Sequence, residues 1–178
     1  AMFRAAGYRV GWYISPHLVD VRERIRIGDQ MISKKAMQAC IEIVRSCQAE
    51  ELTYFEFLTA VAFVHFFRAS VDLAVLEVGM GGRLDATNVV DPHASVITNI
   101  SLEHREFLGD SLDRIAAEKG GIVKRGGTCI TGASQPVVLD VLEAICRERN
   151  ARLLRLGRDL KIRVRPDGLF SYRGFTGA

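Results

Sequence analysis

Apolar and polar positions along the chain form two kinds of pattern, short apolar runs and longer stretches with helical spacing. The clearest run is Leu73–Leu76, which is continuous and is followed by the carboxylate of Glu77. A continuous run of this kind predicts a strand that is buried on both faces of a parallel sheet. We expect this strand to span about Val71–Val78 and to lie at the centre of the sheet. Further short strands are expected at Val10–Ile14, Ala94–Ile100, Thr128–Thr131 and Arg152–Leu156.

Helical spacing of apolar residues marks several segments between these strands. Ser33 and Thr53 are suitable N-caps for helices that run to about Ala49 and Ala69, and Glu56 completes a capping box with Thr53. The second helix is apolar nearly all round, which predicts an interior position. Phe3–Gly7 has the pattern of the tail of a helix that ends at a glycine C-cap, and further helices are expected from Ser111 to about Val123 and over Val137–Arg149. The alternation predicts an α/β fold with a doubly wound, mostly parallel sheet and flanking helices.

Two stretches differ from this alternation of strands and helices. From His17 to Ile32, charged side chains are interspersed with apolar ones, and this pattern predicts a long loop. Near the end of the chain, the turn signal Pro166–Gly168 lies between two short strand-like stretches, Lys161–Val164 and Leu169–Tyr172. This arrangement predicts a small β-hairpin.

Composition and charge exclude several classes of protein. The chain has 178 residues, of which 48% are hydrophobic, and this is enough for one domain with a sizeable core. A net charge of +3 is too mild to indicate a nucleic-acid partner. The longest apolar stretch, Leu58–Phe67, is shorter than the ~20 residues that cross a bilayer, so no membrane partner is expected. Cys40 and Cys47 lie among apolar residues, which predicts buried, reduced thiols of a cytoplasmic protein.

Four polar residues near the ends of predicted strands and helices are candidates for chemistry. Glu77 ends a strand and precedes the glycine loop Gly79–Gly82, and open α/β sheets commonly place functional groups at such a position. His104 and Ser15 follow two other strands, so the three could converge on a divalent cation such as Mg²⁺ or Mn²⁺. A histidine ligand is unusual for Mg²⁺, and each residue taken alone is also typical of a surface turn. Lys119, near a helix C-terminus, is by itself typical of a residue that complements the helix dipole.

The common nucleotide-binding motifs do not occur in this sequence. The phosphate loop Gly-x-x-x-x-Gly-Lys-Ser/Thr is not found. Gly79–Gly82 matches a dinucleotide fingerprint only loosely, because Leu84 occupies the sixth position where glycine or alanine is needed. A nucleophile elbow is not found either.

Several segments resemble the dihydrofolate synthase and folylpolyglutamate synthase family, a branch of the Mur-ligase-like ATP-dependent amide ligases. The most specific of them is Leu-Glu-Val-Gly-Met-Gly-Gly-Arg-Leu-Asp-Ala-Thr-Asn, residues Leu76–Asn88. The other matching segments, in the order of the family, are Gly11–Leu18, Arg22–Ile25, Leu52–Ala60, Val96–His104, Phe107–Asp110 and Ala116–Lys124.

The resemblance implies roles for individual residues. Ser15, Glu77 and His104 match the family's Mg²⁺ ligands, and Lys119 matches a lysine that carries a carbamate. Glu77, His104 and Lys119 would therefore belong to the catalytic machinery. The positions that match segments lining the pterin site are Thr53, Tyr54, Phe55, Glu56, Leu84, Asp85 and Ala86.

The implied reaction has two steps and uses small-molecule substrates only. ATP would phosphorylate a carboxylate of dihydropteroate or of a folate, and the amine of L-glutamate would then displace phosphate from the acyl phosphate. Mg²⁺, or Mn²⁺ in its place, would serve as the metal cofactor. The resemblance also implies a cytoplasmic, monomeric parent enzyme.

The sequence departs from the family pattern in detail and in extent. Ile14, Glu103 and Gly120 stand where the family has threonine, aspartate and alanine. The sequence begins after the family's phosphate loop and ends before its C-terminal domain. We therefore expect a central-domain fragment over residues 1–157, followed by a hairpin or linker over residues 158–178. Such a fragment would bind ATP poorly and would have no ligase turnover alone.

Three alternatives remain at this point. One is another Mur-type ligase that joins an amino acid to a cell-wall precursor, although Thr53–Glu56 and Gly81–Asp85 argue against it. A second is a non-catalytic module that binds a pterin or a folate. The third is an inert folding remnant that binds neither ligand.

Overall fold

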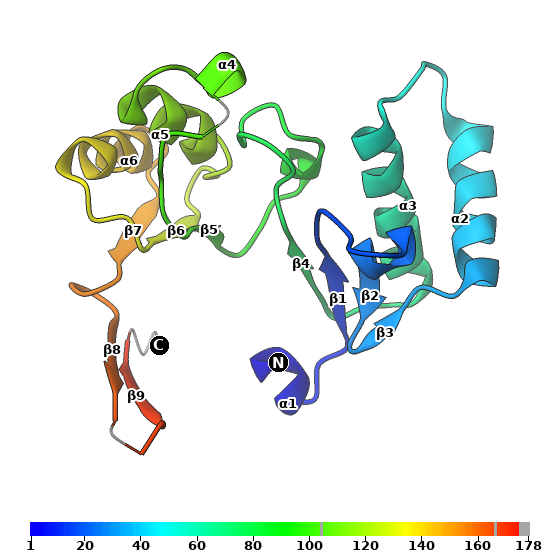
Figure 1. Ribbon diagram of the computed structural model, residues 1–178, viewed down its shortest axis with the longest axis horizontal. Helices are drawn as coiled ribbons and strands as arrows, with labels where there is room; N and C mark the ends of the chain where they lie inside the picture. Colours follow the sequence, from blue (N-terminus) through cyan, green and yellow to red (C-terminus); the bar gives the residue numbers. More distant parts are fainter. Residues whose placement is uncertain (104, 166, 175–178) are drawn as a thin grey trace. The chain divides into compact units, whose positions relative to one another are not determined.

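The computed structural model contains two compact units, each with its own sheet and core (Figure 1). The structure describes residues 1–103, 105–165 and 167–174. The first unit consists of Ala1–Met80 and Asp85–Val89. The second unit consists of Gly81–Leu84 and Val90–Ala178. The expected boundary at residue 157 stays a prediction.

The first unit is built on a four-stranded sheet with the strand order β3-β2-β1-β4. β1 (Val10–Tyr13) pairs in parallel with β4 (Leu73–Leu76), and this pair brings two carboxyl ends to one edge of the sheet. β1 also pairs in antiparallel with β2 (Ile25–Ile27), which in turn pairs with β3 (Gln30–Met31). The sheet of this unit is therefore mixed, with its parallel pair at one side.

The stretch after β1 is more ordered than the sequence pattern predicts. The expectation of a long loop from His17 to Ile32 is wrong in part, because the chain forms the 3-10 helix η1 (Val21–Arg24) followed by β2 and β3. The side chain of Asp20 accepts a hydrogen bond from the Arg22 N–H, and Glu23 completes a capping box. This cap organises a segment that composition alone marks as irregular.

Two helices, α2 (Lys34–Cys47) and α3 (Tyr54–Arg68), pack side by side against one face of this sheet (Figure 1). The predicted caps are confirmed, since Ser33 accepts from the Ala36 N–H and Thr53 forms the capping box with Glu56. The expectation that α3 is interior on all sides is wrong, because Phe67 is 87% exposed. α3 buries the stripe that faces the sheet and α2.

The strand β4 is less buried than its sequence predicts. Among the described strands its hydrogen-bonded neighbour is β1, so β4 lies at the end of the sheet order and not at its centre. Val75 is 43% exposed, and its cross-strand partner Trp12 is 42% exposed, whereas Tyr13 is fully buried. The prediction of burial on both faces is wrong here, because the helices of this unit cover one face of the sheet.

The remaining elements of the first unit are short. α1 (Met2–Ala5) ends before Gly7, whose φ of +91° is readily adopted by glycine and confirms the expected glycine at the helix end. The 3-10 helix η2 (Ala86–Val89) follows the glycine loop. Cys47, at the end of α2, is exposed, so the expectation of a buried thiol is wrong for this residue and right for Cys40.

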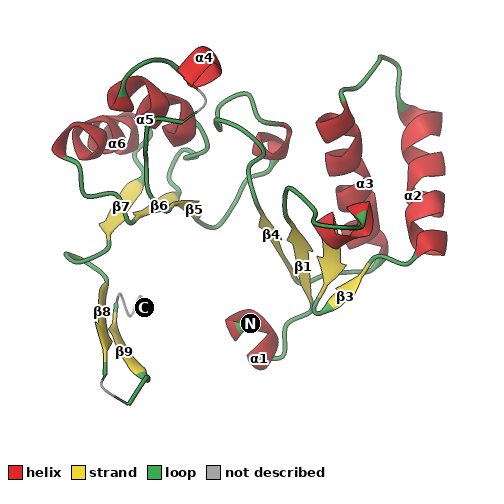
Figure 2. Cartoon of the chain, in the orientation of Figure 1, coloured by secondary structure: helices red, strands yellow, loops and turns green. Residues whose placement is uncertain are grey.

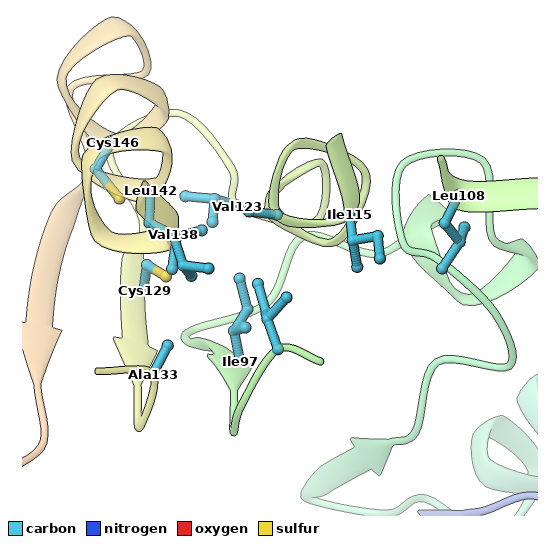
Figure 3. Packing of buried hydrophobic residues seen from close by; sticks show 11 residues of the cluster. Ile97, Leu108, Ile115, Val123, Cys129, Ala133, Val138, Leu142 and Cys146 are labelled. Atoms are coloured by element: carbon cyan, nitrogen blue, oxygen red, sulfur yellow. The ribbon is translucent and has the colours of Figure 1, made fainter. Parts of the chain in front are cut away.

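The second unit has a parallel sheet in the order β5-β6-β7 with two helices on it. The strands are β5 (Ser95–Ile97), β6 (Thr128–Thr131) and β7 (Arg152–Arg155). The helices that pack on them are α5 (Leu112–Gly120) and α6 (Pro136–Glu148), and the short α4 (Arg105–Leu108) precedes them. Figure 3 shows the buried core between these elements, including Cys129, Val138 and Leu142.

The last described elements form the predicted hairpin. β8 (Lys161–Val164) and β9 (Phe170–Arg173) pair in antiparallel (Figure 2). All eight residues are exposed. Pro166 of the predicted turn lies outside the described residues. The predicted α/β fold with parallel strands, flanking helices and a C-terminal hairpin is confirmed, although the described parallel strands are divided between two sheets. Over the described residues, no helix is both long and apolar enough to cross a membrane.

Candidate functional site

Two predicted site residues, Ser15 and Glu77, meet at the carboxyl ends of the parallel strands β1 and β4. The backbone N–H of Ser15 donates a hydrogen bond of 2.9 Å to Oε2 of Glu77. The N–H of Glu77 in turn donates to the carbonyl oxygen of Tyr13 at 2.9 Å, which continues the ladder between the strands. The exposed carboxylate of Glu77 is thereby held at the edge of the sheet, where open α/β sheets bind their ligands.

The chain that follows Glu77 is held by one carboxylate, that of Asp85. Its Oδ2 accepts the backbone N–H groups of Gly79 and Met80, each at 3.0 Å. Its Oδ1 accepts the N–H of Thr87 at 2.9 Å and the hydroxyl of Thr87 at 2.5 Å. Asp85 is one of the residues predicted to line a pterin site, and the structure shows that it also fixes the loop after β4.

Gly79 allows this loop to lie directly on an aromatic side chain. A Cβ added to Gly79 would lie 2.6 Å from Cζ of Phe55, so a larger residue would clash with the ring. Phe55 also contacts Tyr13, with ring centroids 5.8 Å apart. The hydroxyl of Tyr13 is 3.2 Å from the hydroxyl of Thr59, and burial raises the pKa of Tyr13. Phe55 therefore packs between Tyr13 and the loop at Gly79.

The four residues Thr53–Glu56 differ in what they offer to a ligand. The carboxylate of Glu56 accepts from the N–H and the hydroxyl of Thr53 at 2.8 and 2.7 Å, and the hydroxyl bond is the main cause of its lowered pKa. Thr53 and Glu56 are thus engaged in capping α3. Tyr54 is 61% exposed, so its ring remains accessible.

Arg24 lies beside Tyr54 and was not among the predicted site residues. Its guanidinium carbon is 5.8 Å from the centroid of the Tyr54 ring, a cation–π contact. Its Nε donates to Nδ1 of His17 at 2.9 Å. The signal that could have identified Arg24 is the matching segment Arg22–Ile25, which places an arginine just before the buried strand residue Ile25.

Glu23 is a second residue that the sequence interpretation missed. Its carboxylate accepts the backbone N–H groups of Leu18, Val19 and Asp20 at 2.9, 3.0 and 2.7 Å. These backbone hydrogen bonds lower the pKa of Glu23. The chain after Ser15 is therefore folded around this carboxylate, which helps to fix the end of β1.

Of the second predicted pterin segment, Leu84 is 81% exposed and Ala86 is half-buried in η2. The structure assigns Leu84 to the second unit and Asp85 and Ala86 to the first. The role of these residues in a pterin site stays a prediction.

Lys119 lies in the second unit, in the last turn of α5. Its Nζ forms an ion pair of 2.9 Å with Oε1 of Glu103, and the Lys119 side chain is 22% exposed. The neighbouring Glu118 binds Arg83, the residue that follows the glycine loop, since Oε1 of Glu118 accepts from Nε and Nη2 of Arg83 at 3.1 and 2.9 Å. The helix end that carries Lys119 is thereby tied to the chain directly after the glycine loop.

The predicted metal site is seen only in part. The structure brings Ser15 and Glu77 together, whereas His104 lies outside the described residues. Among the residues that the structure describes, no group of three or more His, Cys, Asp or Glu side chains could hold a metal ion. The assignment of Ser15, Glu77 and His104 as metal ligands stays a prediction.

Comparisons with known proteins give a consistent result. A family model described as the Mur ligase middle domain matches residues 27–166. A probable bifunctional folylpolyglutamate synthase/dihydropteroate synthase from Haloferax volcanii is 40% identical over 184 residues, covering 97% of this chain and 21% of the relative. The folylpolyglutamate synthase of Lacticaseibacillus casei is 37% identical over 169 residues, covering 90% of this chain and 40% of that protein.

Solved structures resemble the chain over nearly its whole length. The E. coli FolC protein in complex with DHPP and ADP matches with a TM-score of 0.91 and 37% identity, over 99% of this chain and 42% of that chain. The chain thus spans less than half the length of each of these relatives. The predicted resemblance to dihydrofolate and folylpolyglutamate synthases is confirmed by these matches. Since the family model covers well over half of its residues, the chain belongs to the Mur ligase middle domain family.

Proposed function

We propose that this chain is the central part of an ATP-dependent ligase that joins L-glutamate to dihydropteroate or to a folate. The observation that carries the proposal is the edge formed by β1 and β4. There the exposed carboxylate of Glu77 is fixed by the Ser15 N–H, and the following loop is fixed by Asp85. An acid held at the carboxyl ends of parallel strands is the usual place for chemistry in an open α/β sheet.

The relatives support the same reaction. The Haloferax volcanii relative is named a probable bifunctional folylpolyglutamate synthase/dihydropteroate synthase, and the Lacticaseibacillus casei relative is named a folylpolyglutamate synthase. The E. coli FolC structure contains DHPP and ADP. In the proposed reaction, a substrate carboxylate attacks the γ-phosphorus of ATP and ADP leaves. The amine of L-glutamate then attacks the carbonyl carbon of the acyl phosphate, and inorganic phosphate leaves as the amide bond forms. Positioning and electrostatic stabilisation are the main contributions of the protein to such a transfer.

The donor set at Glu77 fits a hard divalent cation. Oε2 of Glu77 accepts the Ser15 N–H, and within the described part of the chain Oε1 has no hydrogen-bond partner. Carboxylate and hydroxyl oxygens are the ligands that Mg²⁺ and Mn²⁺ prefer. We assign Glu77 and Ser15 to this cation, with His104 as a third ligand. When bound, the cation would neutralise charge on the transferring phosphoryl group.

Lys119 and Tyr54 complete the proposed assignments. The amine of Lys119 is held by Glu103 at 2.9 Å, and a carbamate on Lys119 requires this ion pair to be exchanged for other contacts. The exposed ring of Tyr54, flanked by the guanidinium of Arg24, is suited to stack on a flat heterocycle. Phe55 and Asp85 act on the pterin site by holding the loop at Gly79.

The proposed ligase works in the cytoplasm as a monomer. All four cysteines are free, as expected in a reducing compartment. ATP is a substrate of the whole ligase, whereas for this chain alone we expect poor ATP binding and no turnover. Glutamate-dependent ADP release from the isolated chain would contradict that expectation.

The proposal can be tested in a chimera in which this chain replaces the corresponding segment of E. coli FolC. We expect dihydropteroate- and glutamate-dependent ADP release from the chimera. Glu77→Gln should lower kcat by about 100-fold or more, because a charge that stabilises the transition state is lost. The matched control is Glu148→Gln, on the exposed end of α6, which should leave kcat unchanged.

Other outcomes of this experiment would overturn the proposal. A chimera that folds but releases no ADP with any folate, and that uses a cell-wall precursor, would indicate another Mur-type ligase. A chain that binds dihydropteroate in a calorimetric titration, with no effect of ATP in the chimera, would indicate a non-catalytic pterin-binding module. Glu77→Gln with unchanged kcat would remove Glu77 from the reaction.

A further inference from the structure

The backbone that follows Lys119 has an unusually complete set of hydrogen bonds. A helix end leaves its last carbonyl groups without partners in the helix. Here each carbonyl oxygen from Glu118 to Lys124 accepts a hydrogen bond. Some of the donors lie outside α5 and its turn, since the Arg83 N–H reaches the Glu118 carbonyl at 2.9 Å and the Ser95 hydroxyl reaches the Ile122 carbonyl at 2.9 Å.

One side chain, that of Arg149, serves three of these carbonyl groups. Its Nη1 donates to the carbonyl oxygens of Gly121 at 3.0 Å and of Gly120 at 3.5 Å, and it also donates to that of Val123. Arg149 is the C-cap residue of α6, and its own carbonyl oxygen accepts the Gly126 N–H at 2.9 Å. A single arginine therefore joins the end of α6 to the end of α5 and to the turn after it.

Close packing brings Arg149 within reach of this turn. Gly120 is buried against α6, and a Cβ at Gly120 would lie 2.5 Å from Cδ1 of Ile145. A Cβ at Gly121 would clash with Cβ of Arg83. The glycine at position 120 thus allows α6 to approach α5 closely, and this approach places Arg149 beside the turn after α5.

We propose that Arg149 is a positioning residue for Lys119. The long side chain of Lys119 starts from its Cα and is held at its far end by the ion pair of Nζ with Glu103. By fixing the carbonyl groups just beyond Lys119, Arg149 holds that Cα and so limits where the amine can reach. The positive guanidinium also complements the negative end of the α5 dipole. A link to catalysis rests on the proposed function, in which Lys119 takes part in the reaction.

The first test uses the isolated chain and needs no ligase activity. Arg149→Met removes the donors and keeps most of the side-chain volume, and Arg147→Met is the matched control from the exposed side of α6. We expect amide hydrogen exchange at Ile122 and Val123 to be at least about 10-fold faster in Arg149→Met. The rate at which an amine-directed reagent labels Lys119, measured by mass spectrometry, should also change. Arg147→Met should change neither rate.

A conservative variant keeps this test decisive if Arg149→Met does not fold. Arg149→Lys keeps the charge and a donor nitrogen, but Nζ of lysine lies one bond nearer to Cα than Nη1 of arginine and reaches the three carbonyl groups less well, so we expect intermediate exchange and labelling rates. Unchanged exchange at Ile122 and Val123, or unchanged labelling of Lys119, in each of these variants that folds would overturn the proposal.

The second test connects the position of Lys119 to the reaction. In the FolC chimera, Arg149→Met should lower kcat by about 10- to 100-fold, as expected for a misplaced catalytic group, with KM for dihydropteroate within about twofold. Arg149→Lys should recover part of kcat. Faster exchange with unchanged kcat would show a purely structural role. A chimera that is inactive before any substitution would contradict the proposed function instead, and the exchange and labelling rates would still decide the role of Arg149.

Discussion

The parallel strands β4 and β6 show that burial follows a strand's neighbours more than its own hydrophobicity. β4 reads Leu-Ala-Val-Leu, yet Val75 is 43% exposed and no residue of the strand is fully buried. β6 reads Thr-Cys-Ile-Thr, yet Cys129 and Thr131 are both fully buried. β6 pairs with β5 on one side and β7 on the other and is covered by helices. Among the described strands, β4 pairs with β1 alone and is the last strand of its sheet.

The second unit can bury polar residues because their hydrogen bonds are satisfied. The hydroxyl oxygen of Thr131 accepts the Ala133 N–H at 3.0 Å, and the hydroxyl of Ser95 donates to the carbonyl of Ile122. Burial also raises the pKa of the Cys129 thiol to about 12, so this thiol stays protonated in the core. Polar residues in a strand sequence are therefore compatible with full burial of positions in that strand.

The largest expected loss of folding stability comes from removing side-chain volume beside β6. Leu142→Ala should lower the free energy of unfolding by about 2–5 kcal/mol, because Leu142 is fully buried against the sheet (Figure 3). Val75→Ala, on the exposed face of β4, should cost about 1 kcal/mol or less. Urea unfolding of both variants measures this difference. Equal losses would show that β4 is as buried in solution as β6.

A smaller loss of folding stability is expected when the hydrogen bonds that hold the loop after β4 are weakened. Asp85→Asn keeps the size of the side chain but replaces one of its two acceptor oxygens by an NH₂ group. The remaining oxygen can then accept either from the N–H groups of Gly79 and Met80 or from the N–H and hydroxyl of Thr87, and one pair of donors loses its acceptor. We expect a loss of about 1–3 kcal/mol, together with faster amide exchange at Gly79 and Met80. Asp140→Asn on the exposed side of α6 is the control. Unchanged exchange at the glycine loop would mean that other contacts hold it.

The smallest expected loss of folding stability occurs on acidification, when the carboxylates of the segment after β1 take up protons. The backbone hydrogen bonds to Glu23 lower its pKa below the ordinary 4.5, and the Arg22 guanidinium lowers the pKa of Asp20 to about 2. Both carboxylates therefore stabilise the folded chain above about pH 4.5, and this contribution is lost as the pH falls towards 2. The core around β6 does not depend on these two groups.

NMR can follow this loss at individual residues. The amide signals of Leu18, Val19 and Asp20 should shift as Glu23 takes up its proton, with a midpoint below pH 4.5. In Glu23→Gln these shifts should be absent, and the unfolding temperature should fall less steeply with pH. A midpoint at or above pH 4.5 in the wild type would contradict the hydrogen bonding of Glu23.

Local patterns in the sequence were sufficient for most elements of the fold. The caps at Ser33 and Thr53 and the final hairpin depend on interactions between residues near each other in the chain, and all are observed. The motif residues of the glycine loop were also apparent, because glycine spacing and an acid after an apolar run are local features. The family assignment followed from the same segments and is confirmed by the family model.

Burial and support of the site were decided by the tertiary structure. Whether Leu73–Leu76 is central depends on which strands lie beside it, and hydrophobicity alone does not contain that information. The roles of Glu23 and Arg149 depend on backbone groups that become their partners only when distant or turning segments meet. The sequence by itself thus determined the elements and the chemistry-bearing motif. Only the folded chain decided which side chains hold that motif in place, because their hydrogen-bond partners are set by three-dimensional packing.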